Sequence, residues 1–434
     1  MTQKESELTE LSPAPNNPSQ NTNLWSHFGY FSWFTADTSS AAGTAIRTLA
    51  ISLLGYAVSG STVAAGWLGT TAMIAQQGAS LFGGTYVDRH NRKHLVIVNA
   101  AMGTLIWGTI AILLAAHTLT FPTLMTLSTL ASAINGFLGS ATDAMLRTII
   151  DIQNYSKARS LNEGRDATLL MTGGPIGGFL YGIGAWLPFL VSAILYAVSG
   201  AAASGLPAQS PGSAGTNMHN ESKSRTSFFH DLVEGWTWSL RRRTIVTILI
   251  AAALVNFGVN GIQYAIQLHM MSAGISATFI GMISGGISLA MLLGSLAAGK
   301  LSNKASTGRT VCLAFAFMCV CAITMTFADN YWLALATNSL MGLPFPIINA
   351  MLLGFVFAKS PENMQGRITV TLSTPAQVLS TFCSAAAGTL LPVLSFRGTV
   401  LVFATVLIAG AAIVLCSPSV RQIPQPSRWK YVTL

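Results

Sequence analysis

The segment GGTYVDRHNRK, residues 83–93, places four formal charges in one short turn. An apolar run of about twenty residues lies directly on each side of it, which is the length that crosses the ~30 Å hydrocarbon core of a bilayer as an α-helix. A charged turn between two such runs is typical of a loop that joins two membrane-spanning helices at the membrane surface. The segment therefore predicts a membrane protein.

The composition of the whole chain indicates a polytopic helical membrane protein. Of its 434 residues, 51% are hydrophobic and 9% are charged, whereas about 25% of residues in soluble domains are charged. Apolar runs of spanning length recur along the chain, and we expect an all-α fold with twelve spans. Their approximate positions are residues 30–57, 62–86, 94–116, 120–145, 166–187, 188–206, 244–268, 277–299, 310–328, 331–357, 368–392 and 396–416.

The longest break between spans divides the chain into two sets of six. This break begins as a Pro-, Gly- and Ser-rich linker and ends with apolar residues at a spacing of four, which predicts an amphipathic helix along the membrane interface. The polar start of the chain predicts a disordered tail. We expect a cytoplasmic tail over 1–27, a six-helix bundle over 28–206, the cytoplasmic linker over 207–243, a second six-helix bundle over 244–416 and a second cytoplasmic tail over 417–434.

The positions of the basic residues predict the orientation, because Lys and Arg accumulate in the cytoplasmic loops of membrane proteins. If both tails are cytoplasmic, all of the 23 Lys and Arg residues except Arg47 and Arg397 fall on the cytoplasmic side. We therefore expect a multi-pass protein of the cytoplasmic (inner) cell membrane with both termini inside. The basic residues are scattered over several loops and tails, which argues against nucleic-acid binding.

The two sets of spans resemble each other weakly. When the second set is shifted by 215 positions, Gly66 aligns with Gly281, and GTYVDR aligns with GKLSNK at residues 299–304. The counterpart of Asp88 is then Asn303. Parallel six-helix repeats joined by a long loop are one layout of secondary transporters. The repeat predicts two pseudo-symmetric six-helix bundles.

The charged turn resembles the signature of the major facilitator superfamily of transporters. That signature is a glycine, an Asp-Arg pair after three further residues, and a final basic pair. The matching residues here are Gly84, Asp88, Arg89, Arg92 and Lys93. Asn91 replaces the usual glycine before the basic pair, a mild departure because Asn also adopts left-handed turn conformations.

Other segments resemble particular branches of this superfamily. In the fifth span, Gly174, Pro175 and Gly178 of GGPIGG resemble the Gly-Pro element of its antiporters. The segments KARSLNEGRDA, LVEGWTWSLRRR and NMQGRI resemble the drug and siderophore exporters, which include macrolide efflux proteins and enterobactin exporters. These resemblances imply export by antiport.

The signature also implies a gate at the cytoplasmic face. In the superfamily the aspartate docks at the start of the eleventh helix, here near residues 366–369, so Asp88 is predicted to latch this face when the cavity opens outward. A basic residue at the inner end of the fourth helix commonly joins the network, and Arg147, one turn from Asp143, is the candidate. Topology alone would explain the basic residues of the turn but not Asp88.

Two charged residues fall inside the first span, where a charge costs roughly 2.5–3.5 kcal/mol at the bilayer centre. Asp37 lies about one-third of the way in from the cytoplasm. A carboxylate in partly dry surroundings can load and release a proton near neutral pH, so Asp37 is the predicted proton-coupling residue. The alternative is a solvated interfacial residue. Arg47, near the midplane, needs helix carbonyls, cavity water or an anionic group of the substrate as partner.

A stripe of carboxamides recurs at i, i+4, i+7 and i+11 in the seventh span and so occupies one helical face. Its members are Asn256, Asn260, Gln263 and Gln267. Because amides in lipid would lack partners, this face contacts protein or water. We favour a cavity wall over hydrogen-bonded packing between helices. Weaker candidates for the opposite wall are Gln76, Gln77 and Asn135, and the prolines of GLPFP, residues 342–346, predict a helix break at the cavity.

These features favour a secondary exporter of a small amphipathic, partly anionic compound, driven by inward proton movement. Its expected partners are the substrate, protons and membrane lipids. The chain has no GxxxxGK[ST] phosphate loop. The histidines lack metal-ligand spacing, and few ionisable residues lie in the membrane, so we expect no cofactor, no metal and no enzymatic activity. We expect a monomer. A metabolite importer or facilitator, or a lipid or peptide exporter, would share this fold.

Overall fold

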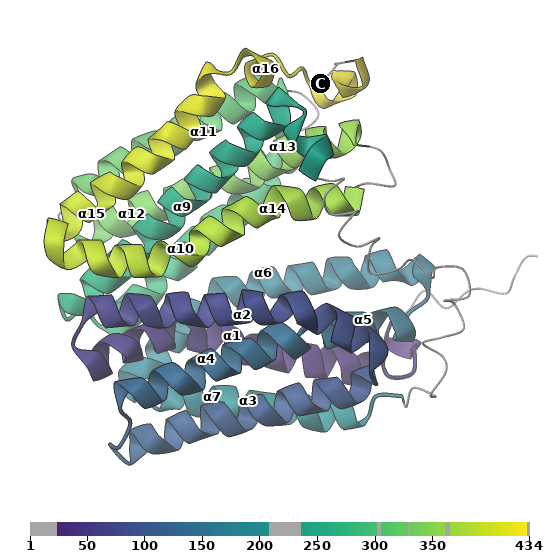
Figure 1. The fold of residues 1–434 in the computed structure, drawn as a ribbon, viewed down its shortest axis with the longest axis vertical. Coiled ribbons are helices and arrows are strands. Elements are labelled where there is room, and N and C mark those ends of the chain that lie inside the picture. The colour runs from purple at the N-terminus through teal and green to yellow at the C-terminus, as the bar shows by residue number, and fades with distance from the viewer. Residues whose placement is uncertain (1–23, 208–235, 302–304, 329, 361–364, 432–434) are drawn as a thin grey trace, which may run out of the picture.

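The structure, a computed structural model, describes residues 24–207, 236–301, 305–328, 330–360 and 365–431. All regular secondary structure in these ranges is helical, in agreement with the expected all-α membrane protein. The helices form two bundles that lie one above the other in Figure 1. Most of the predicted linker helix lies outside the described residues.

The two halves of the chain supply one bundle each. The first half consists of η1 (Leu24–Ser26), α1 (Tyr30–Ser59), α2 (Thr62–Arg89), α3 (Arg92–Ala115), α4 (Phe121–Leu138), α5 (Ser140–Ile149), α6 (Ile152–Ile183) and α7 (Leu187–Ser204). The second half consists of α9 (Arg243–Ser272), α10 (Ala277–Leu301), α11 (Thr307–Thr326), α12 (Tyr331–Gly342), α13 (Pro344–Lys359), α14 (Gln365–Thr381), α15 (Cys383–Cys416), α16 (Pro418–Arg421) and η3 (Pro426–Tyr431).

The helices account for the twelve predicted crossings. Nine helical stretches of the described residues are long and apolar enough to span a membrane. The last, Thr371–Cys416, makes two crossings because the chain reverses direction at Ser395, whose φ is 58°. The remaining two crossings are α2 and α6, which are long enough but more polar. Both pack against helices of the other half rather than only against lipid.

Three crossings are interrupted. The predicted break at GLPFP is present, because α12 ends at Gly342 and α13 begins at Pro344. The fourth crossing is divided at Gly139, between α4 and α5, and the eleventh at Phe382, between α14 and α15. One helix begins well before its predicted span: α6 begins at Ile152, 14 residues early, because its charged first half continues the helix past the apolar run.

A side chain from the first half fills the break in the eleventh crossing. The hydroxyl of Thr70 in α2 donates to the carbonyl of Thr381 at 3.0 Å and accepts from the backbone N–H of Ala385 at 3.0 Å. In an unbroken helix this N–H would bond directly to that same carbonyl. Thr70, which is fully buried, is therefore inserted into the hydrogen-bond ladder and causes the kink.

The segment GGPIGG brings α6 into backbone contact with two other helices. A Cβ on Gly178 would collide with the carbonyl of Ala277 in α10, and a Cβ on Gly281 of α10 would collide with the carbonyl of Gly174. On the adjacent face of α6, Gly177 lies equally close to the backbone of α1. Small residues thus allow α6 to pack against its own half and the opposite half at once.

A second contact between the halves joins α2 to the start of α15. Gly66 and Gly388 face each other so closely that a Cβ on either would collide with the partner backbone. The hydroxyl of Thr62 donates to the carbonyl of Gly388 at 3.2 Å. Further along α2, Gln77 Nε2 donates to Thr381 Oγ1 at 2.9 Å. Hydrogen bonds and backbone packing therefore act together in this contact.

Both contacts lie toward one end of the helices. We call this the far end, and the end at which α1 begins and α15 finishes the tail end. In Figure 1 the halves meet at the far end, on the left, and separate toward the tail end, on the right. Near the tail end of α2, a Cβ on Gly84 would meet open space. The structure is therefore in a conformation that is open toward the tail end.

The C-terminal segment, residues 418–431, packs against the tail end of the second half. The carbonyl of Ile423 accepts from the backbone N–H of Gly308 at 3.0 Å, at the start of α11. Trp429 packs on α13 and donates through Nε1 to Thr307 Oγ1 at 3.0 Å. The segment thus supplies an acceptor to a helix N-terminus that would otherwise lack one, and it ties α11 to α13.

The corresponding turn of the first half is held by basic side chains instead. With the shift of 215 positions, Arg92 and Lys93 correspond to Thr307 and Gly308. Arg92 Nη1 donates to a carbonyl of α5 at 3.1 Å, and Lys93 Nζ donates to the carbonyl that follows α7 at 2.6 Å. At Gly308 a Cβ would collide with the carbonyl of Arg421, so the glycine makes room for the C-terminal segment.

The substitution Gly178→Ala tests the far-end contact. The added methyl must displace the carbonyl of Ala277, so we expect unfolding in lipid nanodiscs to be easier by about 1–3 kcal/mol, measured as a lower thermal midpoint. Gly164→Ala in the same helix is the matched control, because its Cβ meets nothing within 4 Å. Equal midpoints for the two variants would contradict the prediction.

Candidate functional site

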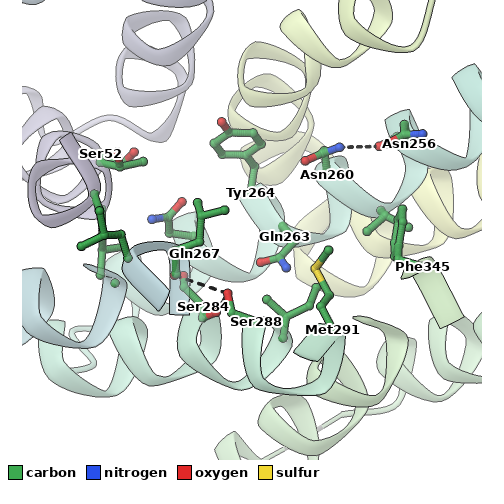
Figure 2. A pocket seen from close by; sticks show the side chains of 18 of the residues that line it. Ser52, Asn256, Asn260, Gln263, Tyr264, Gln267, Ser284, Ser288, Met291 and Phe345 are labelled. Carbon is green, nitrogen blue, oxygen red and sulfur yellow. Dashed lines mark hydrogen bonds between the residues drawn. The ribbon is translucent and has the colours of Figure 1, made fainter. Parts of the chain in front are cut away.

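A cavity of about 550 Å³ lies between the two halves. Helices α1 and α6 of the first half and α9, α10 and α13 of the second half form its walls, as Figure 2 shows in part. Small-molecule sites have volumes of about 300–1,000 Å³. The lining residues are Ala45, Thr48, Leu49, Ser52, Leu169, Leu170, Gly174, Asn256, Val259, Asn260, Gln263, Tyr264, Gln267, Ser284, Ile287, Ser288, Met291, Phe345 and Asn349.

All four carboxamides of the predicted stripe line this cavity from α9 (Figure 2). Asn256 Nδ2 donates to the carbonyl of Ala252, and Asn260 Nδ2 donates to the carbonyl of Asn256, both at 2.8 Å. These bonds hold the side chains along their own helix. Phe345, from the predicted helix break, and Asn349 lie on the wall formed by α13. No periodic pattern singled out Asn349, which is one polar residue in an apolar run.

The predicted candidates for the opposite wall line a second cavity. This cavity has a volume of about 600 Å³ and lies between α2, α4, α5 and α14. Gln76, Gln77 and Asn135 line it together with Asp143 and Gln377. The amides that we expected around one cavity are therefore distributed over two.

Asp37 forms an ion pair that no sequence pattern predicts. Its Oδ2 lies 2.6 Å from Nη1 of Arg165 in α6, and the two side chains are 18% and 11% exposed. Arg165 also donates to Thr38 Oγ1 at 3.2 Å and to Asp166 Oδ1 at 2.8 Å. Arg165 lies one residue before the predicted fifth span and was therefore assigned to the membrane surface. The available signal was the adjacent Arg-Asp pair at the edge of that span.

The ion pair lies between the tail end and the first cavity. On α1, Asp37 precedes the lining residue Ala45 by eight positions, which is about 12 Å along a helix axis. On α6, Arg165 precedes the lining residue Leu169 by four positions, or about 6 Å. The pair therefore joins the same two helices that form the wall of the cavity in the first half.

Arg47 lies inside the first half and lines neither of these cavities. Its guanidinium is 4.2 Å from the centroid of the Trp107 ring, and its Nη2 donates to the hydroxyl of Tyr196 at 3.5 Å. Its side chain is buried, and Nη1 has no hydrogen-bond partner among the described residues. Asn135 Nδ2 donates to the same hydroxyl at 3.4 Å, so Tyr196 connects Arg47 to the second cavity.

The signature turn separates into two groups of residues. Arg92 and Lys93 hold the first half together through the carbonyl contacts already described. Asp88 and Arg89 are exposed at the tail end, and neither forms an ion pair with another described residue. The docking position predicted for Asp88, residues 366–369, consists mostly of side chains outside the described residues.

The predicted gate residues of the fourth crossing are exposed as well. Asp143 pairs with Arg159 of α6 at 3.2 Å, and Arg159 also contacts Glu163 at 2.9 Å. Arg147, one turn further along α5, is exposed and is not the partner of Asp143 in this conformation. Exposed ion pairs contribute about 0–1 kcal/mol, so this network can rearrange at little cost.

The sequence match identifies the family. The profile of the Major Facilitator Superfamily matches residues 33–369 and, separately, residues 248–430. These matches cover most of the chain, which therefore belongs to the Major Facilitator Superfamily, whose members are typically non-enzymatic carriers. No curated protein matches the chain in sequence.

Solved structures share the fold at low sequence identity. The crystal structure of the nucleoside transporter NupG aligns with a TM-score of 0.66 and 13% identity over 88% of this chain and 98% of NupG. A bacterial homologue of the iron transporter ferroportin, in an inward-facing state, aligns with a TM-score of 0.64 and 13% identity over 89% of this chain and 97% of that protein. A bacterial metal transporter aligns with a TM-score of 0.64 and 13% identity over 93% of this chain and 99% of that protein. At such identities the likeness shows the fold alone.

Removing Arg165 tests how strongly the buried pair holds α1 to α6. Arg165→Leu leaves Asp37 without its cation, and we expect a loss of about 3 kcal/mol in unfolding free energy, measured by thermal or denaturant unfolding. The double variant Asp37→Asn/Arg165→Leu should recover much of that loss. Arg159→Leu, which removes an exposed pair on the same helix, is the control and should cost less than about 1 kcal/mol. The prediction would be contradicted if Arg165→Leu and Arg159→Leu lowered the unfolding free energy by similar amounts.

Proposed function

We propose that the protein is a secondary active transporter that exports a small amphipathic compound, such as a drug, a siderophore or a similar metabolite, by proton antiport. The superfamily match and a cavity between two six-helix halves support alternating access. The observation that carries proton coupling is the largely buried pair of Asp37 and Arg165 beside the cavity. The antiporter-like element, Gly174, Pro175 and Gly178, lies at the contact between the halves and supports export.

Protonation of Asp37 changes the contact between α1 and α6. A neutral carboxyl forms no ion pair with Arg165, but the arginine retains Asp166 at 2.8 Å. Arg165 is therefore not left as an unpaired charge, which would be costly in a buried site. The proton thus removes the ion pair between two helices of the cavity wall, and a conformation that prefers the neutral carboxyl becomes more populated.

The gate at the tail end follows from the open conformation. If both termini are cytoplasmic, as the basic residues predict, the tail end is the cytoplasmic face and the structure is open inward. When the halves rock so that the far-end contact opens, this face closes. Gly84 and Asp88 of α2 then approach the start of α14, where Asp88 forms the latch. Asp143 and Arg147 lie close enough on α5 to join it.

We place the transporter in the cytoplasmic (inner) cell membrane as a monomer that acts on its substrate and protons. Import or facilitated diffusion of a metabolite, and export of a lipid or peptide, are the alternatives on this fold. NupG transports nucleosides and other structural neighbours transport metals. No group of three or more His, Cys, Asp or Glu side chains is placed to bind a metal among the described residues. The amide-rich lining therefore favours an organic solute.

Replacing Asp37 tests the proton coupling. We expect Asp37→Asn to abolish the effect of a pH gradient on accumulation in inside-out membrane vesicles, because the neutral amide cannot exchange a proton. The vesicles are supplied with a panel of antibiotics, siderophores and lipids, and each variant is compared at equal protein level. The direction of transport in the same assay separates export from import.

Glu163→Gln is the matched control for Asp37. Glu163 lies on α6 but pairs with Arg159, and its side chain is 63% exposed, so its loss should leave the response to the pH gradient intact. A normal gradient response in Asp37→Asn would remove Asp37 from the coupling mechanism, and loss of the response in both variants would show that the effect is not specific to Asp37.

Asp88→Asn tests the latch. Asparagine keeps the shape of the side chain but lacks the charge that docks at a helix N-terminus, so we expect slower transport with unchanged thermal stability in the open conformation. The accessibility of cysteine residues to a thiol reagent added from the side of the tails should rise, because the conformation in which this face is closed is less populated. Transport at the rate of the unsubstituted protein would contradict the latch.

A further inference from the structure

We propose that the first cavity takes an uncharged solute that carries several hydroxyl or amide groups together with an apolar surface. This inference rests on the proposed transport function and names the substrate class of the same site. It follows from the charge, the hydrogen bonding and the arrangement of the lining side chains.

The described lining of this cavity has no formal charge. Ten of its nineteen residues are polar and uncharged, and they include five carboxamides. Arg47 was the cation that favoured a partly anionic substrate, but it packs against Trp107 inside the first half. Asp37 and Arg165 neutralise each other outside the lining. A charged solute would enter this cavity without a counter-charge, and an unpaired buried charge is strongly disfavoured.

The lining offers both acceptors and donors to a solute. One N–H of Asn256 and one of Asn260 are used on carbonyls of α9, which leaves each side chain its oxygen and a second N–H. The hydroxyls of Thr48 and Ser288 are donated to carbonyls of their own helices, at 2.7 Å and 3.0 Å, so their oxygen atoms remain as acceptors. Solute hydroxyl or amide groups, which both donate and accept, are the complementary partners.

The longest run of polar groups lies on one wall of the cavity. The stripe from Asn256 to Gln267 extends over twelve residues of α9, or about 16 Å along the helix axis. Smaller numbers of polar residues come from α1, α10 and α13, and Leu169 of α6 and Ile287 and Met291 of α10 provide apolar surface elsewhere in the lining. A solute that combines hydroxyl or amide groups with hydrocarbon or an aromatic ring matches this lining.

Equilibrium binding of three related probes tests the charge preference. The probes are phenyl β-D-glucoside, which is neutral and donor-rich, phenyl phosphate, which is anionic, and phenyltrimethylammonium, which is cationic. All three carry the same ring. Binding to the full chain in lipid nanodiscs is followed by tryptophan fluorescence. We expect the glucoside to bind saturably and at least tenfold more tightly than either charged probe.

Two variants assign the binding to the amide stripe. Asn260→Leu should weaken glucoside binding at least tenfold, because the solute hydroxyl groups lose a carboxamide partner. Gln263→Glu keeps the size of the side chain and adds a negative charge, and it should raise the affinity for phenyltrimethylammonium at least tenfold. Gln422→Leu, an exposed amide in the C-terminal segment, is the matched control and should change neither affinity.

The outcomes separate this inference from the proposed function. It is overturned if the glucoside shows no saturable binding, if either charged probe binds as tightly, or if Asn260→Leu and Gln422→Leu behave alike. Binding is measured without a proton gradient. A neutral preference together with a normal gradient response in Asp37→Asn would therefore uphold the substrate class while contradicting proton coupling.

Discussion

The backbone contact between the halves at the far end is the constraint on which the other features depend. Because Gly178 and Gly281 carry no side chains, the backbones of α6 and α10 touch directly rather than through a thick layer of interlocked residues. A contact of this kind has few interlocked side chains to separate when the halves move apart at the far end. It also leaves the rest of both helices free to border a cavity, so the same glycines that join the halves make room for a solute between them.

The features that the sequence could predict are those that depend on local pattern. The length of apolar runs predicted the crossings, the helical period predicted the single face shared by Asn256 and Gln267, and the prolines of GLPFP predicted the break before Pro344. The distribution of the amides over two cavities could not be predicted in this way. It depends on how α2 is rotated, and Thr70 sets that rotation by bonding to residues more than 300 positions away.

Sequence patterns could not predict the partners of the charged residues inside the bundle either. Asp37 and Arg165 lie on different helices and are separated by 127 intervening residues, and no spacing connects them. Their contact further requires α6 to continue past its apolar run, which places Arg165 within the bundle. Arg47 shows the opposite case. The sequence indicated that it needs a partner, but the partner is an aromatic ring, which stabilises a cation without any charged residue.

The C-terminal segment has a consequence for the synthesis of the protein. In the first half, the turn before α3 is held by Arg92 and Lys93, which belong to that turn, so the half can complete its structure as soon as α7 has emerged. In the second half, the equivalent turn is held by Ile423 and Trp429, which lie more than 100 residues further along the chain. The second half therefore completes this turn only after residues 418–431 have been translated, and a chain that terminates before them leaves the start of α11 uncapped.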